Sequence, residues 1–168
     1  MSAWAGTLST LPVGHAPTAG ELAAYHDALA AISDTWNDYS GSLSWTAAVT
    51  NPVLNNGTIV AKYIQVGKFV LYTGSITMGS TTTFGSSTWF VSLPVTPIAS
   101  GTGNTTYPGA ALLYDSSATA GRISGTPSIF TTTQVDFYIG SGGVVNNVTP
   151  FTWATGDILG WTLIYEAA

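Results

Sequence analysis

The chain has 168 residues, and only 11 of them carry a permanent charge, 3 Lys and Arg against 8 Asp and Glu. Charged residues make up 7% of the sequence, against about 25% in a typical globular protein, whereas 26 Thr and 17 Ser supply polar hydroxyl groups. An apolar fraction of 45% excludes intrinsic disorder. A net charge of −5 argues against nucleic acid as a partner, because binding it requires clustered Lys and Arg.

The absence of Cys excludes a disulfide framework, a thiolate metal site and a cysteine nucleophile. No run reaches the roughly 18 apolar residues of a membrane span, so we expect no membrane segment. The amino terminus, Met1–Gly6, lacks a basic region followed by a long apolar run, so no signal peptide is predicted. A protein of this kind that works outside a cell would be made in the cytoplasm and released by lysis.

Residues 1–17 have no usable hydrophobic period. Their apolar side chains, among them Trp4, Leu8 and Leu11, are spaced between Gly, Pro and hydroxyl residues. Because Trp is costly to leave in water, we interpret this segment as an extended docking arm, with a disordered tail as the alternative.

A short helix is predicted over residues 18–38. Thr18 and Glu21 form the Thr-x-x-Glu pattern of a capping box, directly after Pro17. An apolar stripe then follows at the heptad spacing of a coiled-coil seam: Leu22, Tyr25, Leu29, Ile32 and Trp36. Two heptads are too short to be stable alone, so we expect the stripe to associate with its copies in a homotrimer. The alternative is one helix packed on its own domain.

Residues 39–168 are predicted to form an antiparallel, jelly-roll-like β-sandwich. This region is rich in Thr, Val, Ile and aromatic residues, interrupted by Gly, Asn and Pro at turn positions. Both faces of the last predicted strand are apolar or aromatic, which favours burial on both sides, with another subunit as one cover. The predicted strands are Ser42–Thr50, Thr58–Val66, Lys68–Met78, Thr88–Leu93, Gly109–Asp115, Gln134–Ile139 and Asp157–Glu166, with shorter ones near Ile123 and Ile129.

Several blocks of residues, in order and with similar spacing, resemble the β-rich module of virion proteins from tailed phages that infect actinobacteria. The blocks are Trp36–Tyr39, Ser44–Thr46, Thr50–Pro52, Asn55–Thr58, Tyr63, Val66–Lys68, Met78–Gly85, Ser92–Val95 and Phe151–Asp157. Such proteins are described as minor tail or tail-fibre proteins, and some resemble capsid decoration proteins. The resemblance covers roughly residues 18–168 and implies a homotrimeric knob on a virion surface without catalytic residues. The chain lacks the long shaft of a full tail fibre, so its position on the virion stays open.

The sequence gives little sign of catalysis. The carboxylates after the helix lie on separate predicted strands and turns, where we expect Asp115 and Asp157 to cap turns and Asp136 to face solvent. His15 and His26 have no spacing typical of a zinc site. We therefore expect no enzyme activity, no metal and no cofactor.

Aromatic residues are the best candidates for binding, because sugar rings stack on exposed aromatic faces. Trp89, after the predicted loop Thr81–Ser87, and Tyr107, in a stretch rich in Gly, Asn and Thr, are the predicted glycan contacts. The alternative is that these rings belong to the core or to an interface. Trp36 and Trp45 are expected to pack where the helix meets the sheet.

Three functions follow from these observations. The first is a trimeric virion knob of the minor tail or tail-fibre type, which binds other virion proteins and contacts a glycan on the host cell surface. The second is a capsid decoration protein that stabilises the head through its arm. The third is a free, monomeric carbohydrate-binding module.

Overall fold

The computed structural model describes residues 16, 18–32, 36–98, 109–118, 121–140 and 142–168, and of residues 28–32 it describes only the backbone. The chain divides into two units, with the boundary between Thr35 and Trp36. The predicted arm residues Trp4, Leu8 and Leu11 and the predicted glycan contact Tyr107 lie outside the described residues.

The first unit contains helix α1, Ala19–Ile32. The predicted capping box is confirmed: the Thr18 N–H donates to Glu21 Oε2 at 2.8 Å, and the Glu21 N–H donates to Thr18 Oγ1 at 3.3 Å. Leu22 is 55% exposed and Tyr25 is half-buried. The side chains of Leu29 and Ile32 lie outside the described part, although their backbone is helical.

The prediction that the helix extends to residue 38 is wrong, and Trp36 does not belong to the helical stripe. Residues Asn37–Asp38 form strand β1, in which Asn37 pairs with Tyr63 and Asp38 with Lys62. Trp36 belongs to the second unit, where the Nζ atom of Lys62 lies 4.7 Å from the centre of its ring. The pairing of the next residue, Asn37, and this cation–π contact hold Trp36 beside the edge strand β1.

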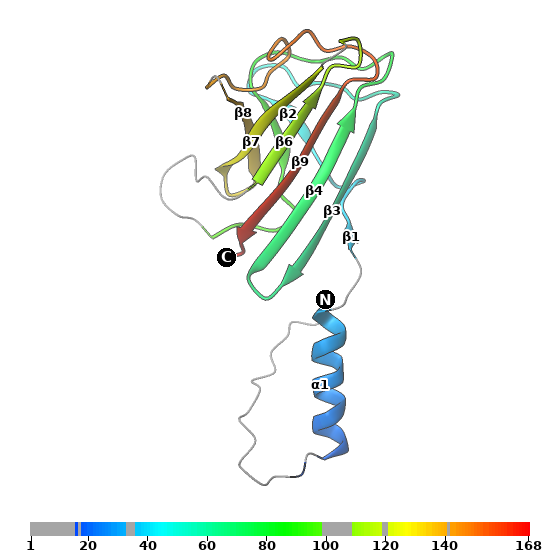
Figure 1. Ribbon diagram of the computed structural model, residues 1–168, viewed down its shortest axis with the longest axis vertical. Helices are drawn as coiled ribbons and strands as arrows, with labels where there is room; N and C mark the ends of the chain where they lie inside the picture. Colours follow the sequence, from blue (N-terminus) through cyan, green and yellow to red (C-terminus); the bar gives the residue numbers. More distant parts are fainter. Residues whose placement is uncertain (1–15, 17, 33–35, 99–108, 119–120, 141) are drawn as a thin grey trace. The chain divides into compact units, whose positions relative to one another are not determined.

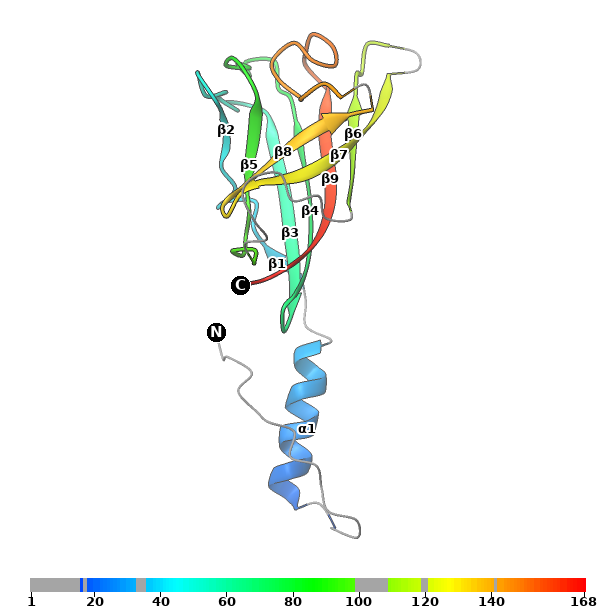
Figure 2. The same cartoon turned by 90° about the vertical axis from the view of Figure 1, so that its left-hand side faces the viewer.

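The second unit is mainly β and consists of a curled antiparallel sheet with nine strands among the described residues. The sheet order is β1-β3-β4-β9-β6-β7-β8-β5-β2, and every strand pair is antiparallel. Figure 1 shows β3, β4, β9 and β6 side by side, and Figure 2 shows β7 and β8 crossing towards β5 and β2. The remaining strand bounds are β2 Trp45–Ala47, β3 Thr58–Val66, β4 Phe69–Thr77, β5 Trp89–Ser92, β6 Gly109–Tyr114, β7 Arg122–Thr131, β8 Gln134–Ile139 and β9 Ile158–Glu166.

Strand β7 makes the sheet curl. The sequence suggested two short strands near Ile123 and Ile129, but they form one strand of ten residues. Its first part pairs with β6 and its second part with β8, and Gly125 pairs with both Ala111 and Ile139. A Cβ atom on Gly125 would lie 2.8 Å from the Tyr138 carbonyl oxygen, so only glycine permits this approach at the corner.

The core lies inside the curl and is dominated by aromatic rings. Trp45 and Trp153 pack against Trp89 with ring centroids 4.8 and 4.9 Å away. The buried Tyr72 and Tyr165 donate hydrogen bonds to the Ser92 and Val95 carbonyl oxygens at 3.1 and 2.9 Å. These bonds tie the segment after β5 to the opposite wall of the core and satisfy hydroxyl groups that burial would otherwise penalise. Burial raises the pKa of both tyrosines far above the ordinary value.

Within the described residues, no helix combines the length and apolar character that crossing a membrane requires.

Candidate functional site

Strand β9 presents two different faces. Leu159, Trp161, Leu163 and Tyr165 point into the core and are buried. The alternate residues, which include Thr162 and Ile164, are half-buried or exposed. The sequence suggested a strand covered on both sides; within a single chain, only the inner side is covered.

The outward-facing residues of β3, β4, β9 and β6 form one continuous surface, which we call the outer face. The register aligns its rows across the strands: Val66 pairs with Phe69, Ile64 with Leu71, and Leu71 with Ile164. The outer face comprises Val60, Lys62, Ile64, Val66, Phe69, Leu71, Thr73, Ser75, Gly160, Thr162, Ile164, Ala110 and Leu112.

The outer face exposes large apolar side chains to solvent. Phe69 is 48% exposed, and Val60, Val66, Leu112 and Ile164 are also exposed. Adjacent strands lie about 4.8 Å apart, so Val66, Phe69, Ile64, Leu71 and Ile164, which occupy two neighbouring rows, form a contiguous apolar patch at one end of the face. Val60 and Leu112 lie beyond the row that contains Thr73 and Thr162. Scattered apolar residues are ordinary on a protein surface, but a contiguous patch indicates a contact with another molecule.

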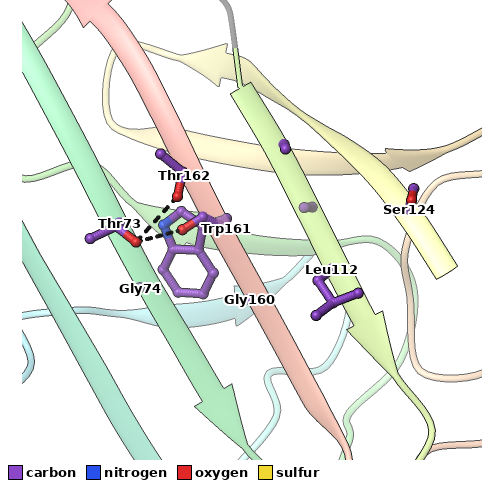
Figure 3. A pocket seen from close by; sticks show the side chains of 9 residues that line it. Thr73, Gly74, Leu112, Ser124, Gly160, Trp161 and Thr162 are labelled. Carbon is purple, nitrogen blue, oxygen red and sulfur yellow. Dashed lines mark hydrogen bonds between the residues drawn. The ribbon is translucent and has the colours of Figure 1, made fainter. Parts of the chain in front are cut away.

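An open depression of about 450 Å³ lies in the middle of the outer face. Its floor is at Gly160, because a Cβ atom there would meet nothing closer than two carbonyl oxygens at 3.8 Å. Figure 3 shows Thr73, Thr162 and Leu112 around this glycine; Thr73 Oγ1 donates to the Trp161 carbonyl oxygen at 3.0 Å and lies 3.3 Å from Thr162 Oγ1. The lining has hydroxyl and methyl groups and no ionisable side chain.

The sheet beneath the depression is held by close packing between Gly74 and Trp161, which are paired residues of β4 and β9. A Cβ atom on Gly74 would lie 2.5 Å from the Trp161 ring, so the indole occupies the space that any other residue would fill. Trp161 also contacts the rings of Tyr72 and Phe137, at 5.7 and 5.6 Å between centroids. The outer face is therefore supported by a tightly packed layer of aromatic rings.

Trp89, the predicted glycan contact, is in the core and cannot stack on a sugar. Its side chain is 0% exposed, and its Nε1 atom donates to the Phe84 carbonyl oxygen at 3.0 Å. Its ring packs between Trp45 and Trp153. Trp45 is likewise buried in the body, against the expectation that it packs where helix meets sheet. Of the described Trp residues, only Trp36 is exposed, at 39%.

The carboxylates of the loops support turns, as the sequence suggested for two of them. Asp157 accepts hydrogen bonds from Ser116 N, Ser116 Oγ and Ala154 N at 2.7–2.9 Å. Asp115 accepts from Ser117 N and Oγ, and these bonds lower the pKa of its carboxyl.

Asp136 does not face solvent, which corrects the expectation from the sequence. Its side chain is buried on β8, and its Oδ1 atom has no hydrogen-bond partner. Burial raises the pKa of Asp136, and hydrogen bonding from Tyr138 offsets only part of that effect.

Among the described residues, no three His, Asp or Glu side chains come close enough together to hold a metal ion. His26 is exposed on α1, 3.8 Å from the Asp27 carboxylate.

The outer face was not identified from the sequence, although a signal for it exists. In β3 and β4 both alternating sets of residues are partly apolar, for example Ile64 and Val66 as well as Ala61 and Tyr63. A strand with one solvated face has polar residues at every second position.

Comparison with protein-family models, with curated proteins and with solved structures found no match to this chain.

Proposed function

We propose that this chain is a non-enzymatic structural protein of a tailed-phage virion, a trimeric surface knob of the minor tail or tail-fibre type that contacts the host surface. The outer face is the observation that carries the proposal. It is a well-supported sheet surface with exposed apolar side chains and an uncharged centre, which suits a protein built into an assembly. The resemblance to phage virion modules points to the same class of protein.

The proposed trimer uses both units of the chain. Helix α1 has a formed capping box, and its Leu22 side chain is largely exposed, which is consistent with association of the stripe Leu22, Tyr25, Leu29 and Ile32. The body is proposed to be a jelly-roll-like sandwich. The curl at β7, which places β8, β5 and β2 opposite the β4 and β9 wall, supports that arrangement.

A structural role also accounts for the acidic residues. Asp115 and Asp157 are engaged in turns, and Asp136 is buried in the sheet. A glycosidase needs two carboxyl groups facing one substrate bond. Carboxylates that serve as structural supports fit a protein without that chemistry.

A capsid decoration protein is the alternative within the same class. The chain is small, and an arm at residues 1–17 would suit attachment across capsid subunits. A free carbohydrate-binding module is less favoured, because four Trp residues, Trp45, Trp89, Trp153 and Trp161, are buried.

Two measurements test the proposal. Sedimentation of the full chain should give three times the 17.3 kDa chain mass, and a monomer at all concentrations would contradict the trimer. Quantitative mass spectrometry of purified virions should find a few to dozens of copies for a tail protein and hundreds for a capsid protein. Absence from virions would contradict both virion roles.

Removal of residues 1–17 tests the docking arm. The truncated chain should still form the trimer but fail to enter the particle. Normal incorporation of the truncated chain would contradict the arm.

A further inference from the structure

We propose that the outer face is the surface through which the bodies of neighbouring copies contact each other, turned towards the three-fold axis of the assembly. The occupant of the face is a second copy of this chain. This inference rests on the proposed trimer and adds to it by assigning the contact between bodies to particular residues.

The apolar end of the outer face supplies the contact. Phe69 and Val66 are paired across β4 and β3, and the next row contains Ile64, Leu71 and Ile164. The two rows lie on three neighbouring strands and include three exposed side chains, Val66, Phe69 and Ile164. Burial of such a cluster against an equivalent cluster removes apolar surface from water, which drives association.

Charged side chains surround the outer face but are absent from its centre. Lys62 lies at the β3 edge, with Asp38 paired beside it on β1. Glu166 is paired with Phe69 at one end and lies 3.8 Å from Lys68, and Arg122 lies over the Tyr114 ring at the other end. All three cations of the chain are therefore on the rim of this one face. An interior free of charge with a charged rim is the common anatomy of a protein–protein interface.

The signs of the rim charges favour a second copy as the occupant. The rim has two carboxylates, Asp38 and Glu166, and three cations, Lys62, Lys68 and Arg122, so the net charge of the rim is close to zero although the chain as a whole is acidic. The other described acids of the body, Asp115, Asp136 and Asp157, lie on strands or turns outside the face. Chains with a net charge of −5 repel one another, and this face lets them meet without opposing acidic surfaces.

The size of the face indicates that it is one part of a larger interface between copies. Four strands about 4.8 Å apart and up to nine residues long cover an area of about 500 Å². A standard interface buries about 800 Å² on each partner. One face alone falls short of that value. In the proposed trimer the stripe of helix α1 supplies the remaining contact area, so the outer face and the helix together hold the copies.

Lysine substitutions on the outer face test the inference with the full-length chain. Ile164→Lys and Leu112→Lys each place like charges in a contact between copies. We expect either substitution to weaken association by at least about tenfold in concentration-dependent sedimentation. Val49→Lys is the matched control, because Val49 is 77% exposed and lies outside the face. It should leave association unchanged, and circular dichroism should show all three variants folded.

The outcomes separate the inference from the proposed trimer. A wild-type trimer that both face variants leave intact would overturn the contact through the outer face while the trimer itself stands. A wild-type chain that is monomeric at every concentration would overturn both. Equal weakening by Val49→Lys would also contradict the inference, because the effect would then be general.

A single introduced thiol provides an independent test, because the chain has no Cys of its own. Thr162→Cys places the thiol in the middle of the outer face, and Val49→Cys places it outside. We expect the thiol at position 162 to react with a disulfide reagent at least about tenfold more slowly in the assembled state than after dilution into monomers. The thiol at position 49 should react at one rate in both states. Equal rates in both states for position 162 would refute the contact.

Discussion

At the scale of single residues, Asp157 holds two loops together from a fully buried position. Its carboxylate accepts three hydrogen bonds, two from Ser116 and one from the Ala154 N–H. Asp157→Asn replaces one acceptor oxygen by a donor amide, which leaves a buried N–H or O–H group opposed to another donor. We expect a loss of about 2–4 kcal/mol in the free energy of unfolding, measured by urea denaturation.

Asp115→Asn is the matched control for that experiment. The Asp115 carboxylate accepts two hydrogen bonds from Ser117 within its own turn. Because these bonds are exposed to water, we expect a much smaller loss of stability than for Asp157→Asn. If both variants lost the same free energy of unfolding, the hydrogen bonds between Asp157 and the distant Ser116 would contribute no more to stability than the local bonds of Asp115.

Asp136 makes the stability of the body depend on pH. Burial raises its pKa in the folded state above the ordinary value of 3.8. The protonated carboxyl is thus favoured by folding, and its contribution to stability is complete below the unfolded pKa and is lost as pH rises through the folded pKa. Asp136→Asn, a neutral isostere, should therefore stabilise the protein at pH 7 and have little effect at pH 3.

Thermal unfolding of Asp136→Asn and the wild-type chain between pH 3 and pH 8 checks this prediction. The difference in Tm should grow with pH. A variant less stable than the wild-type chain at pH 7 would mean that the ionised carboxylate is stabilised in the fold, contrary to the direction of its pKa shift.

At the scale of elements, the pairing of β4 with β9 depends on Gly74. A methyl group there would lie 2.5 Å from the Trp161 ring, inside the core. Gly74→Ala should therefore force the indole and its aromatic neighbours to move, at a cost of about 2–4 kcal/mol in the free energy of unfolding.

Gly160→Ala tests the opposite face of the same strand pair. A Cβ atom at Gly160 points outward and meets nothing closer than 3.8 Å. Since alanine restricts the unfolded chain more than glycine does, we expect this variant to be as stable as the wild-type chain or up to about 1 kcal/mol more stable. If both variants lost a similar free energy of unfolding, the requirement for glycine would come from the backbone conformation of the strands and not from the contact with Trp161.

The sequence predicted the long strands better than their arrangement. Enrichment in β-branched and aromatic residues, bounded by turn residues, marked β3 at its observed bounds, Thr58–Val66, and β9 to within one residue. Strand β1 has only two residues, so it has no period of its own, and it forms because β3 offers a partner. Trp36 fitted the helical spacing, but sheet pairing directly after it overrode that local pattern.

The burial of polar and aromatic residues was harder to predict, because it depends on contacts between distant segments. A Trp after a loop and an Asp within a strand both suggested exposure, yet Trp89 and Asp136 are buried. The curl at Gly125 decides both cases, since it brings β8 and β5 over the wall that contains β4 and β9. Nothing local to residues 89 or 136 indicates that curl.

At the scale of the whole molecule, the few charged residues are distributed unevenly over the body. All three cations lie on the rim of the outer face, whereas three of the acids support turns or strands elsewhere in the body. Ion pairs on such a rim are exposed and contribute little to affinity, so in the proposed contact the apolar residues of the outer face contribute most of it.

The salt dependence of association follows from that distribution. Exposed rim charges are screened at moderate ionic strength, but burial of apolar surface is not. The association constant of the full chain should therefore change by less than about threefold between 50 and 500 mM sodium chloride. Sodium sulfate should strengthen association, because sulfate is excluded from protein surfaces and favours apolar burial. Sedimentation equilibrium in the two salts measures both effects. A loss of association of tenfold or more in sodium chloride would mean that ion pairs hold the copies together, and the apolar residues of the outer face would then not be the source of the affinity.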